Sequence, residues 1–236
     1  MRRPYAGTWT KIVQQSEHGQ AGAAAYAGSM ATHDHWLFTQ IYRLIARAED
    51  SGVVGRARTE VSSHLYGRLL VVGLGPAEDL HHLPDAVNEV VGVEPSASMR
   101  KAAEAAIARA AMPVEVIDAV GEDLPLADDT VDSVLFAYVL CSVDDPAAVI
   151  REALRVLRPG GTIAVLEHVV AGEGSWMRRT QRLVSPIWPR LAGGCRCDQD
   201  TRAVFAEAGL ELGDLESTTL TNVPPVAPAL VGTIRV

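Results

Sequence analysis

Short apolar segments alternate with helix-like segments through the middle of this chain, and this alternation limits the fold more than any other feature. The apolar runs have the length of strands buried on both faces and lie at Leu69–Gly73, Val87–Val93, Val114–Asp118, Val131–Val139 and Thr162–Leu166. Helical patterns separate them, at Ser96–Ala111 and Pro146–Leu157. Strands alternating with helices form parallel sheets with helices on both faces. We therefore expect an α/β protein with a doubly wound, mostly parallel sheet.

The two ends of the chain differ from this central region. Residues 1–31 show no clear apolar period and predict a loose arm or lid, whereas the apolar spacing over His33–Val61 predicts a helix. Near the other end we expect a short helix at Asp200–Ala208 and two strands, Leu210–Glu216 and Leu230–Val236.

Composition excludes several classes of protein. The 236 residues carry 29 acids and 21 bases, a net charge of -8, which argues against a nucleic-acid partner. No apolar run approaches the roughly 18 residues of a membrane span. Lys11, Glu17 and His18 interrupt any signal-peptide core. Three cysteines form no disulfide framework, so we expect a cytoplasmic protein.

A ligand site is expected beyond the carboxyl ends of the strands, as in other open α/β sheets. The first such end carries Gly73-Leu74-Gly75, where the glycines allow a tight turn and close approach of a ligand. A dinucleotide motif would have a third glycine at position 78, but this chain has Glu78. A carboxylate there would repel a pyrophosphate, which argues against NAD and FAD.

The second strand ends with Glu94-Pro95. Glu94 follows Gly73 by about 20 residues, the separation at which an acid accepts hydrogen bonds from ribose hydroxyls. The site therefore suits a nucleoside without phosphates, and S-adenosyl-L-methionine (SAM) is the common cofactor of that description.

Residues 68–168 resemble the core of class I SAM-dependent methyltransferases. The matching segments are Leu70–Gly75, Val93–Pro95, Gly121–Pro125, Val131–Val134 and Val156–Gly161. Further segments resemble one subgroup, the methyltransferase-like thiol S-methyltransferases and their bacterial relatives. They are Val139–Val143, Leu166–Val169 and Gly194-Cys195 followed by Asp200-Thr201.

The resemblance implies a single Rossmann-like domain over residues 1–236, with a seven-stranded sheet, an antiparallel C-terminal strand and an N-terminal helical lid. Residues 1–61 would form the arm and lid, 68–168 the SAM-binding core, and 169–236 the substrate-side insertion and last strands. It also implies SAM contacts from Gly73, Leu74, Gly75, Glu94, Pro95, Gly121, Glu122, Ala137 and Tyr138.

Two positions depart from the family pattern. The family usually has an acid at position 71, which helps to hold the methionine ammonium, and a glycine at position 77; this chain has Val71 and Ala77. Glu78 or Asp79 could replace the missing carboxylate from the next turn. The alternative is a SAM-like fold that no longer binds SAM productively and works by binding a partner.

The candidates for chemistry lie at the ends of the later strands and in the lid. His168 is the best candidate for a base or for a group that orients the substrate. Cys141 is expected beside the reaction as a small buried residue, not as a nucleophile. His33 and Tyr26, together with Tyr42, would cover the site from the lid. Cys195 and Cys197 have no second pair at a suitable spacing, so no metal is expected.

These observations favour a SAM-dependent methyltransferase that acts on a small, largely apolar acceptor. Sulfur is the favoured acceptor atom, because of the subgroup resemblance and because the chain has no obvious acid–base pair, which a readily ionised thiol needs least. Oxygen, nitrogen and carbon acceptors, including a quinone or lipid precursor, stay open as alternatives. Trp176 and Trp188 lie in a segment that we expect to form a wall of the substrate site, although packing in the core would explain the two tryptophans equally well.

Overall fold

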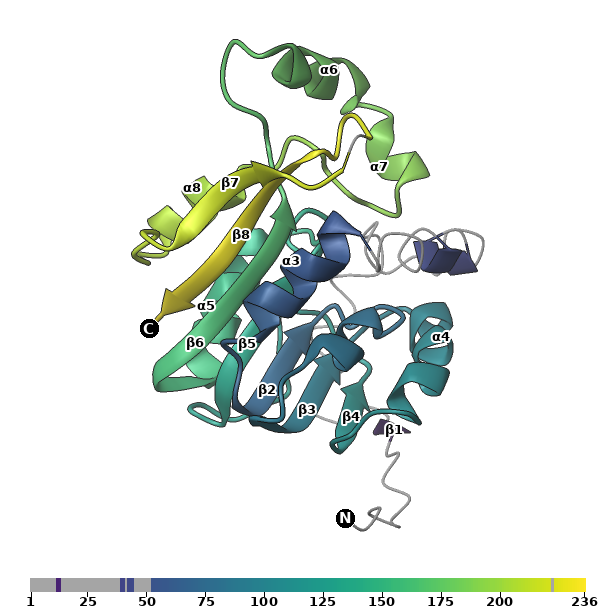
Figure 1. The fold of residues 1–236 in the computed structure, drawn as a ribbon, viewed down its shortest axis with the longest axis vertical. Coiled ribbons are helices and arrows are strands. Elements are labelled where there is room, and N and C mark those ends of the chain that lie inside the picture. Colours follow the sequence, from purple (N-terminus) through teal and green to yellow (C-terminus); the bar gives the residue numbers. More distant parts are fainter. Residues whose placement is uncertain (1–11, 14–38, 41, 45–51, 222) are drawn as a thin grey trace.

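The computed structural model describes residues 12–13, 39–40, 42–44, 52–221 and 223–236. Within them the strands form one sheet in the order β1-β4-β3-β2-β5-β6-β8-β7 (Figure 1). Their bounds are β1 Ile12–Val13, β2 Gly67–Val72, β3 Val87–Val93, β4 Val114–Ile117, β5 Val131–Ala137, β6 Leu157–His168, β7 Leu215–Thr219 and β8 Pro228–Arg235.

The direction of the strands agrees with the expected fold. Strands β1 to β6 pair in parallel, while β8 runs antiparallel to both β6 and β7. The expected antiparallel C-terminal strand is thus confirmed as β8. The expected seven strands are all present, and the two-residue β1 adds an eighth beside β4.

Helices cover both faces of this sheet, with α3 in front of it and α5 behind it in Figure 1. Their bounds are α3 Val53–Ser62, the 3₁₀ helix η3 Glu78–His82, α4 Ala97–Ile107, α5 Pro146–Val156, α6 Trp176–Val184, α7 Trp188–Leu191 and α8 Thr201–Glu207. The start of α5 follows the predicted chemistry, because the Asp145 side chain accepts a hydrogen bond from the Ala148 N–H at 3.0 Å.

Alternate residues of β2 divide the core into two halves, because successive side chains of a strand point to opposite faces. Leu70 and Val72 belong to the cluster that contains residues of α5 and α8. Leu69 and Val71 belong to the cluster that contains residues of α3, η3 and α4. The side chain at position 71 therefore points into an apolar core.

The helix predicted over His33–Val61 is not continuous. Residues 39–40 and 42–44 are helical, but α3 begins only at Val53, after Gly52 with φ -101° and ψ -148°. Gly52 is free to leave the helical region, and it follows the polar run Glu49-Asp50-Ser51, which offers no apolar stripe. Most of the expected lid, including Tyr26 and His33, lies outside the described residues.

The strand predicted over Leu210–Glu216 was placed too early. Leu210 and Leu212 pack against the core as loop residues, and a turn at residues 213–214 precedes β7 at Leu215–Thr219. Four of the five residues of β7 are exposed, so this edge strand has no apolar run by which the sequence could predict it. The apolar spacing here marks contact with the core instead of a strand.

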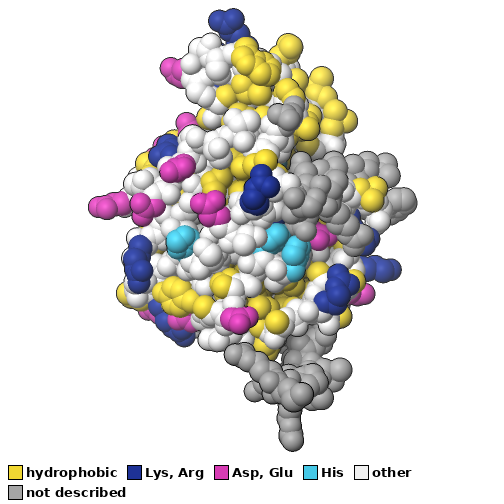
Figure 2. Space-filling model, in the orientation of Figure 1, with side chains coloured by type: hydrophobic (Ala, Val, Ile, Leu, Met, Phe, Trp, Pro, Cys, Tyr) yellow, Lys and Arg dark blue, Asp and Glu magenta, His cyan; other side chains and the backbone are white. Residues whose placement is uncertain are grey.

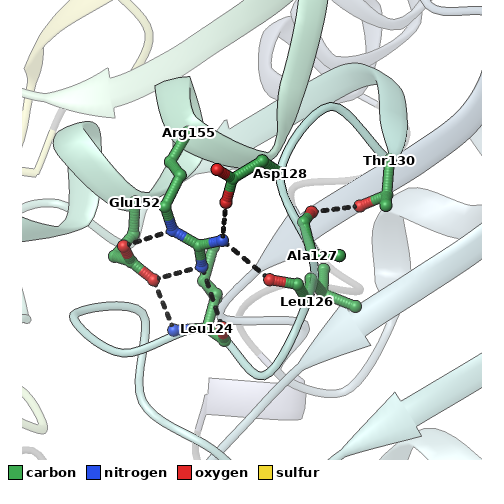
Figure 3. Close-up of polar contacts among 7 residues, drawn as sticks. All are labelled: Leu124, Leu126, Ala127, Asp128, Thr130, Glu152 and Arg155. Carbon is green, nitrogen blue, oxygen red and sulfur yellow. Dashed lines mark hydrogen bonds and ion pairs between the residues drawn. The ribbon is translucent and has the colours of Figure 1, made fainter.

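Arg155 of α5 fixes the loop that follows β4 (Figure 3). Its guanidinium donates hydrogen bonds to the carbonyls of Leu124 and Leu126 at 3.0 and 2.8 Å and to Glu152 at 2.7 and 2.8 Å. Glu152 in turn accepts a hydrogen bond from the Leu124 N–H at 2.9 Å. The loop that carries Gly121 and Glu122 is thereby tied to α5.

Helices α6 and α7 lie beyond the end of β6 and carry large exposed apolar side chains. Figure 2 shows apolar side chains gathered at the top of the molecule, over these helices. Trp176, Leu183, Ile187 and Leu191 are 65%, 79%, 59% and 72% exposed. Among the described helices, none has the length and apolar character needed to cross a bilayer.

Candidate functional site

A cavity of about 300 Å³ lies at the carboxyl ends of β2, β3, β5 and β6, where the topology predicts a ligand site. Most of the residues expected at the site line this cavity: Gly73, Gly75, Glu94, Pro95, Gly121, Glu122, Ala137, Tyr138, Cys141 and His168. Tyr42 also lines it, whereas Leu74 is not among the described lining residues and is buried against Gly92. Tyr26 and His33 lie outside the described residues.

The turn after β2 depends on Gly73. Its φ is +66°, and a Cβ at this position would lie 2.4 Å from Cγ2 of Val139. Any other residue would therefore be strained and would push away the segment after β5. Ala77, where the family pattern has glycine, also adopts the left-handed conformation, with φ +62°. The backbone of the motif is thus kept although the glycine is replaced.

Glu94 lies at the end of β3 and its side chain is held from two sides. Oε2 accepts a hydrogen bond from the Gly75 N–H and Oε1 from the Ser96 N–H, both at 2.9 Å. Burial raises the pKa of this carboxyl above its ordinary value, and the two backbone donors oppose the rise. Each oxygen keeps a lone pair for a further donor, and the side chain lines the cavity.

Glu122 joins the cavity wall to the start of α5. Its Oε1 accepts hydrogen bonds from the N–H groups of Asp144 and Asp145, at 3.0 and 3.3 Å. A carboxylate at this helix start is favoured by the helix dipole as well as by the hydrogen bonds.

The residues expected to replace a carboxylate at position 71 do not reach the cavity. Val71 is 1% exposed, and neither Glu78 nor Asp79 is among the described residues that line the cavity. Asp79 instead forms a buried ion pair with Arg58 of α3. Neither of these two carboxylates therefore lines the cavity in place of the acid that the family usually has at position 71.

Arg58 is a site residue that the sequence reasoning missed. Its guanidinium lies 5.4 Å from the centre of the Tyr138 ring, and both residues line the cavity. A basic residue in an amphipathic helix predicts a solvated surface, so no sequence signal separates Arg58 from Arg56, the other arginine of α3. Its neighbour Tyr42 has a pKa raised to about 12, chiefly because the phenol is buried.

Glu167 supports the end of the cavity that lies away from Glu94, and its side chain is fully buried. Its Oε1 accepts hydrogen bonds from the N–H groups of Val139 and Leu140, at 2.8 and 3.0 Å. Burial raises the pKa of the Glu167 carboxyl well above its ordinary value. The side chain thus fixes the turn after β5 from the neighbouring strand β6.

Cys141 lies in this turn, and His168 is the last residue of β6 beside it. The His168 ring packs on the Tyr138 ring, with 4.3 Å between centres and 36° between planes. Cys141 is 1% exposed, and its Sγ lies 3.8 Å from the Tyr138 carbonyl oxygen and 3.5 Å from Ser142 Oγ. A hydrogen bond with Cys195, together with burial, holds the pKa of the Cys141 thiol well above its ordinary value.

Cys195 also lines the cavity, which the sequence reasoning did not foresee. The ligand-type atoms of Cys141, His168 and Cys195 all lie within 4.8 Å of one another. Spacing along the chain suggests Cys197 as the partner of Cys195. Cys197, however, is not among the described residues that line the cavity. Trp188 lines the cavity as expected of the 169–236 segment, whereas Trp176 is exposed elsewhere.

The central part of this chain is similar to known methyltransferases. Residues 70–165 match the family model described as a methyltransferase domain. A thiol S-methyltransferase (TMT1B) of Rattus norvegicus is 34% identical over 151 residues, 61% of this chain and 62% of that protein. A ubiquinone/menaquinone biosynthesis C-methyltransferase of Desulfotalea psychrophila is 36% identical over 98 residues, 42% of this chain and 39% of that protein.

The fold comparison agrees with this result. The crystal structure of a SAM-dependent methyltransferase from Thermotoga maritima aligns with a TM-score of 0.61 and 19% identity, over 85% of this chain and 97% of that one. This likeness concerns the fold alone. The chain spans less than two thirds of the length of the two curated relatives described above.

Proposed function

We propose that the protein methylates the sulfur of a small, largely apolar thiol, with SAM as donor, because residues 70–165 match the family model of a methyltransferase domain. The observation that supports this most is the cavity itself. It has a buried acid suited to ribose at one end and apolar and sulfur-containing side chains at the other.

The residues of the first end suit the nucleoside of SAM. Glu94 is fixed by the Gly75 and Ser96 N–H groups, so it can accept ribose hydroxyls without losing freedom on binding. Gly73 and Gly75 leave room for close approach, and Gly121, Glu122, Ala137 and Tyr138 supply the remaining wall. SAM supplies an electrophilic methyl group on a sulfonium sulfur.

The residues of the second end suit an acceptor that ionises readily. A thiol has a pKa of about 8.5 and is partly thiolate at neutral pH, so little base catalysis is needed. Val139, Val143, Trp188 and Val226 give this end of the cavity an apolar wall. His168 lies there as the group that orients the acceptor or helps to remove its proton.

The remaining parts of the proposal concern the rest of the chain. We propose that residues 1–236 act as one methyltransferase domain. The three cysteines are all free, which supports a reducing, cytoplasmic location.

A carbon acceptor is the second candidate, and the similarity to the Desulfotalea psychrophila C-methyltransferase favours it. The two candidates differ in the chemistry they need. A carbon, oxygen or nitrogen acceptor depends more on a base or on substrate activation than a thiol does.

The test is incubation of the protein with isotope-labelled SAM and matched panels of thiols, phenols, amines and quinone precursors, read by mass spectrometry. We expect label in thioether products, at a rate that rises with pH toward the ionisation of the thiol. Label only in another class of product would contradict sulfur as acceptor. A calorimetric titration that shows no SAM binding would contradict methyl transfer and favour a protein that works by binding a partner.

A further inference from the structure

Three residues from three separate segments converge at one end of the cavity. Cys141 lies in the turn after β5, His168 is the last residue of β6, and Cys195 follows α7. Their Sγ and ring nitrogen atoms lie within 4.8 Å of one another, and all three residues line the cavity. Cys141 and Cys195 are only 1% and 8% exposed. Two buried thiols and a half-buried imidazole thus meet at the cavity wall.

This set of ligands is typical of zinc sites. Cysteine sulfur and histidine nitrogen are the preferred ligands of Zn²⁺, which binds them tetrahedrally. Zinc–sulfur bonds of about 2.3 Å place two sulfurs about 3.8 Å apart, so a shift on the order of 1 Å would close the cluster around an ion. Two thiolates also neutralise a divalent cation, which leaves no net charge in an apolar wall.

The surrounding structure holds these residues in place. The Arg196 N–H donates a hydrogen bond to the Cys141 carbonyl at 2.7 Å, which ties the loop of Cys195 to the turn of Cys141. Gly194 has φ +93°, and a Cβ there would lie 3.4 Å from the Ser142 carbonyl oxygen. The Tyr138 ring packs on His168. Such contacts around a ligand set are what orients it for a metal.

We propose that Cys141, His168 and Cys195 bind one Zn²⁺ ion, with the fourth ligand position open to the cavity. Three protein ligands and one open position are the arrangement of zinc sites that bind substrates, whereas purely structural sites have four protein ligands. The proposal concerns this cluster alone and does not involve Cys197.

The open position suits a soft ligand such as the acceptor thiol, and this step rests on the proposed function. An R–SH molecule would replace a water on the ion and release its proton to solvent, so that a bound thiolate remains. His168 would then act on the acceptor as a metal ligand and not as the proton acceptor.

The test is metal analysis of the full chain purified under reducing conditions, followed by Co²⁺ titration of the chelator-treated protein. We expect about one zinc per chain and, with Co²⁺, thiolate-to-cobalt charge-transfer bands and tetrahedral d–d bands. Cys141→Ser and Cys195→Ser should each weaken metal binding on the order of 100-fold or more. Cys197→Ala, at a buried cysteine outside the cluster, is the matched control and should bind as the wild type does.

Thermal unfolding of every variant checks that weaker binding does not reflect a lost fold. No zinc in the wild type together with no cobalt bands would overturn the proposal. Cobalt bands that persist in both cluster variants would overturn it as well, because the ion would then lie elsewhere.

A thiol such as a short alkyl thiol, added to the cobalt protein without SAM, tests the open position. A shift of the d–d bands is expected, and unchanged bands would overturn that part of the proposal. Metal binding that stays intact in a protein unable to methylate any thiol would instead contradict the proposed function, so the two failures are distinguishable.

Discussion

The Glu94 carboxylate accepts a hydrogen bond from the Gly75 N–H, with 2.9 Å between Oε2 and the nitrogen. This contact joins the end of β3 to the glycine turn after β2, the two segments that sequence reasoning assigns to one ligand. It fixes the acid before any ligand arrives, so the cost of ordering this side chain is met during folding.

Replacement of Glu94 by alanine should weaken SAM binding by about 2–3 kcal/mol, because hydrogen bonds to a charged group are lost. Calorimetric titration measures the effect. Glu89→Ala is the matched control, since Glu89 lies on the same strand, away from the cavity, in a half-exposed pair with Arg68. Equal dissociation constants for Glu94→Ala and the wild type would remove Glu94 from the SAM site.

SAM binding should weaken on acidification at a pH above the ordinary glutamate value. Burial raises the pKa of Glu94, so the carboxylate that ribose hydroxyls need is lost earlier as the pH falls. Because a bound ligand that donates to the carboxylate favours its charged form, the dissociation constant should rise from neutral pH to about pH 5. Titrations over this range measure the trend, and Glu94→Gln should abolish it. A trend of the same size in that variant would assign it to another group.

Replacement of Val71 by glutamate should destabilise the protein without improving SAM binding. The residue is 1% exposed in the core cluster of α3, η3 and α4, where an unpaired carboxylate costs on the order of 3–5 kcal/mol. Melting temperatures with and without SAM measure both effects, and Val71→Ile controls for a change of volume. Tighter SAM binding in Val71→Glu would show instead that position 71 faces the methionine ammonium.

Replacement of Arg155 by alanine should lower the free energy of unfolding by about 2 kcal/mol, because the loop after β4 loses its donors. The loss is limited because the Arg155 side chain is 32% exposed, so water screens its contacts. Arg151→Ala is the matched control, since its side chain on the same helix is 67% exposed. Urea unfolding measures the difference, and equal losses in both variants would contradict a special role for Arg155.

The effect of Arg155→Ala should also depend on pH. Hydrogen bonds from Arg155 lower the pKa of the Glu152 carboxyl in the folded protein. This contribution is fully present above the ordinary glutamate pKa and is lost as the pH falls through the lowered value. The difference in stability between the wild type and Arg155→Ala should therefore shrink as the pH falls through this lowered pKa, while the part that comes from the Leu124 and Leu126 carbonyls should remain. A constant difference between neutral and acidic pH would show that Glu152 does not carry the effect.

The sequence by itself determined where strands and helices follow one another along the central part of the chain. It also determined that the cavity lies at the carboxyl ends of the strands. The predicted strand Val87–Val93 is the observed β3, and the predicted start of a helix at Pro146 is the observed start of α5. Both follow from local causes, namely a continuous apolar run and a cap with a proline at the first turn. Gly73 and Glu94 were found for a similar reason, because topology alone places strand ends together.

Only the tertiary structure decided which side chains meet across segments. It placed Val71 in a core, paired Asp79 with Arg58, and brought Cys195 to Cys141 and His168. No regular spacing of residues along the chain predicts any of these contacts. Each depends on the path of a loop and on the direction of a side chain, and packing between distant elements fixes both after the local structure has formed.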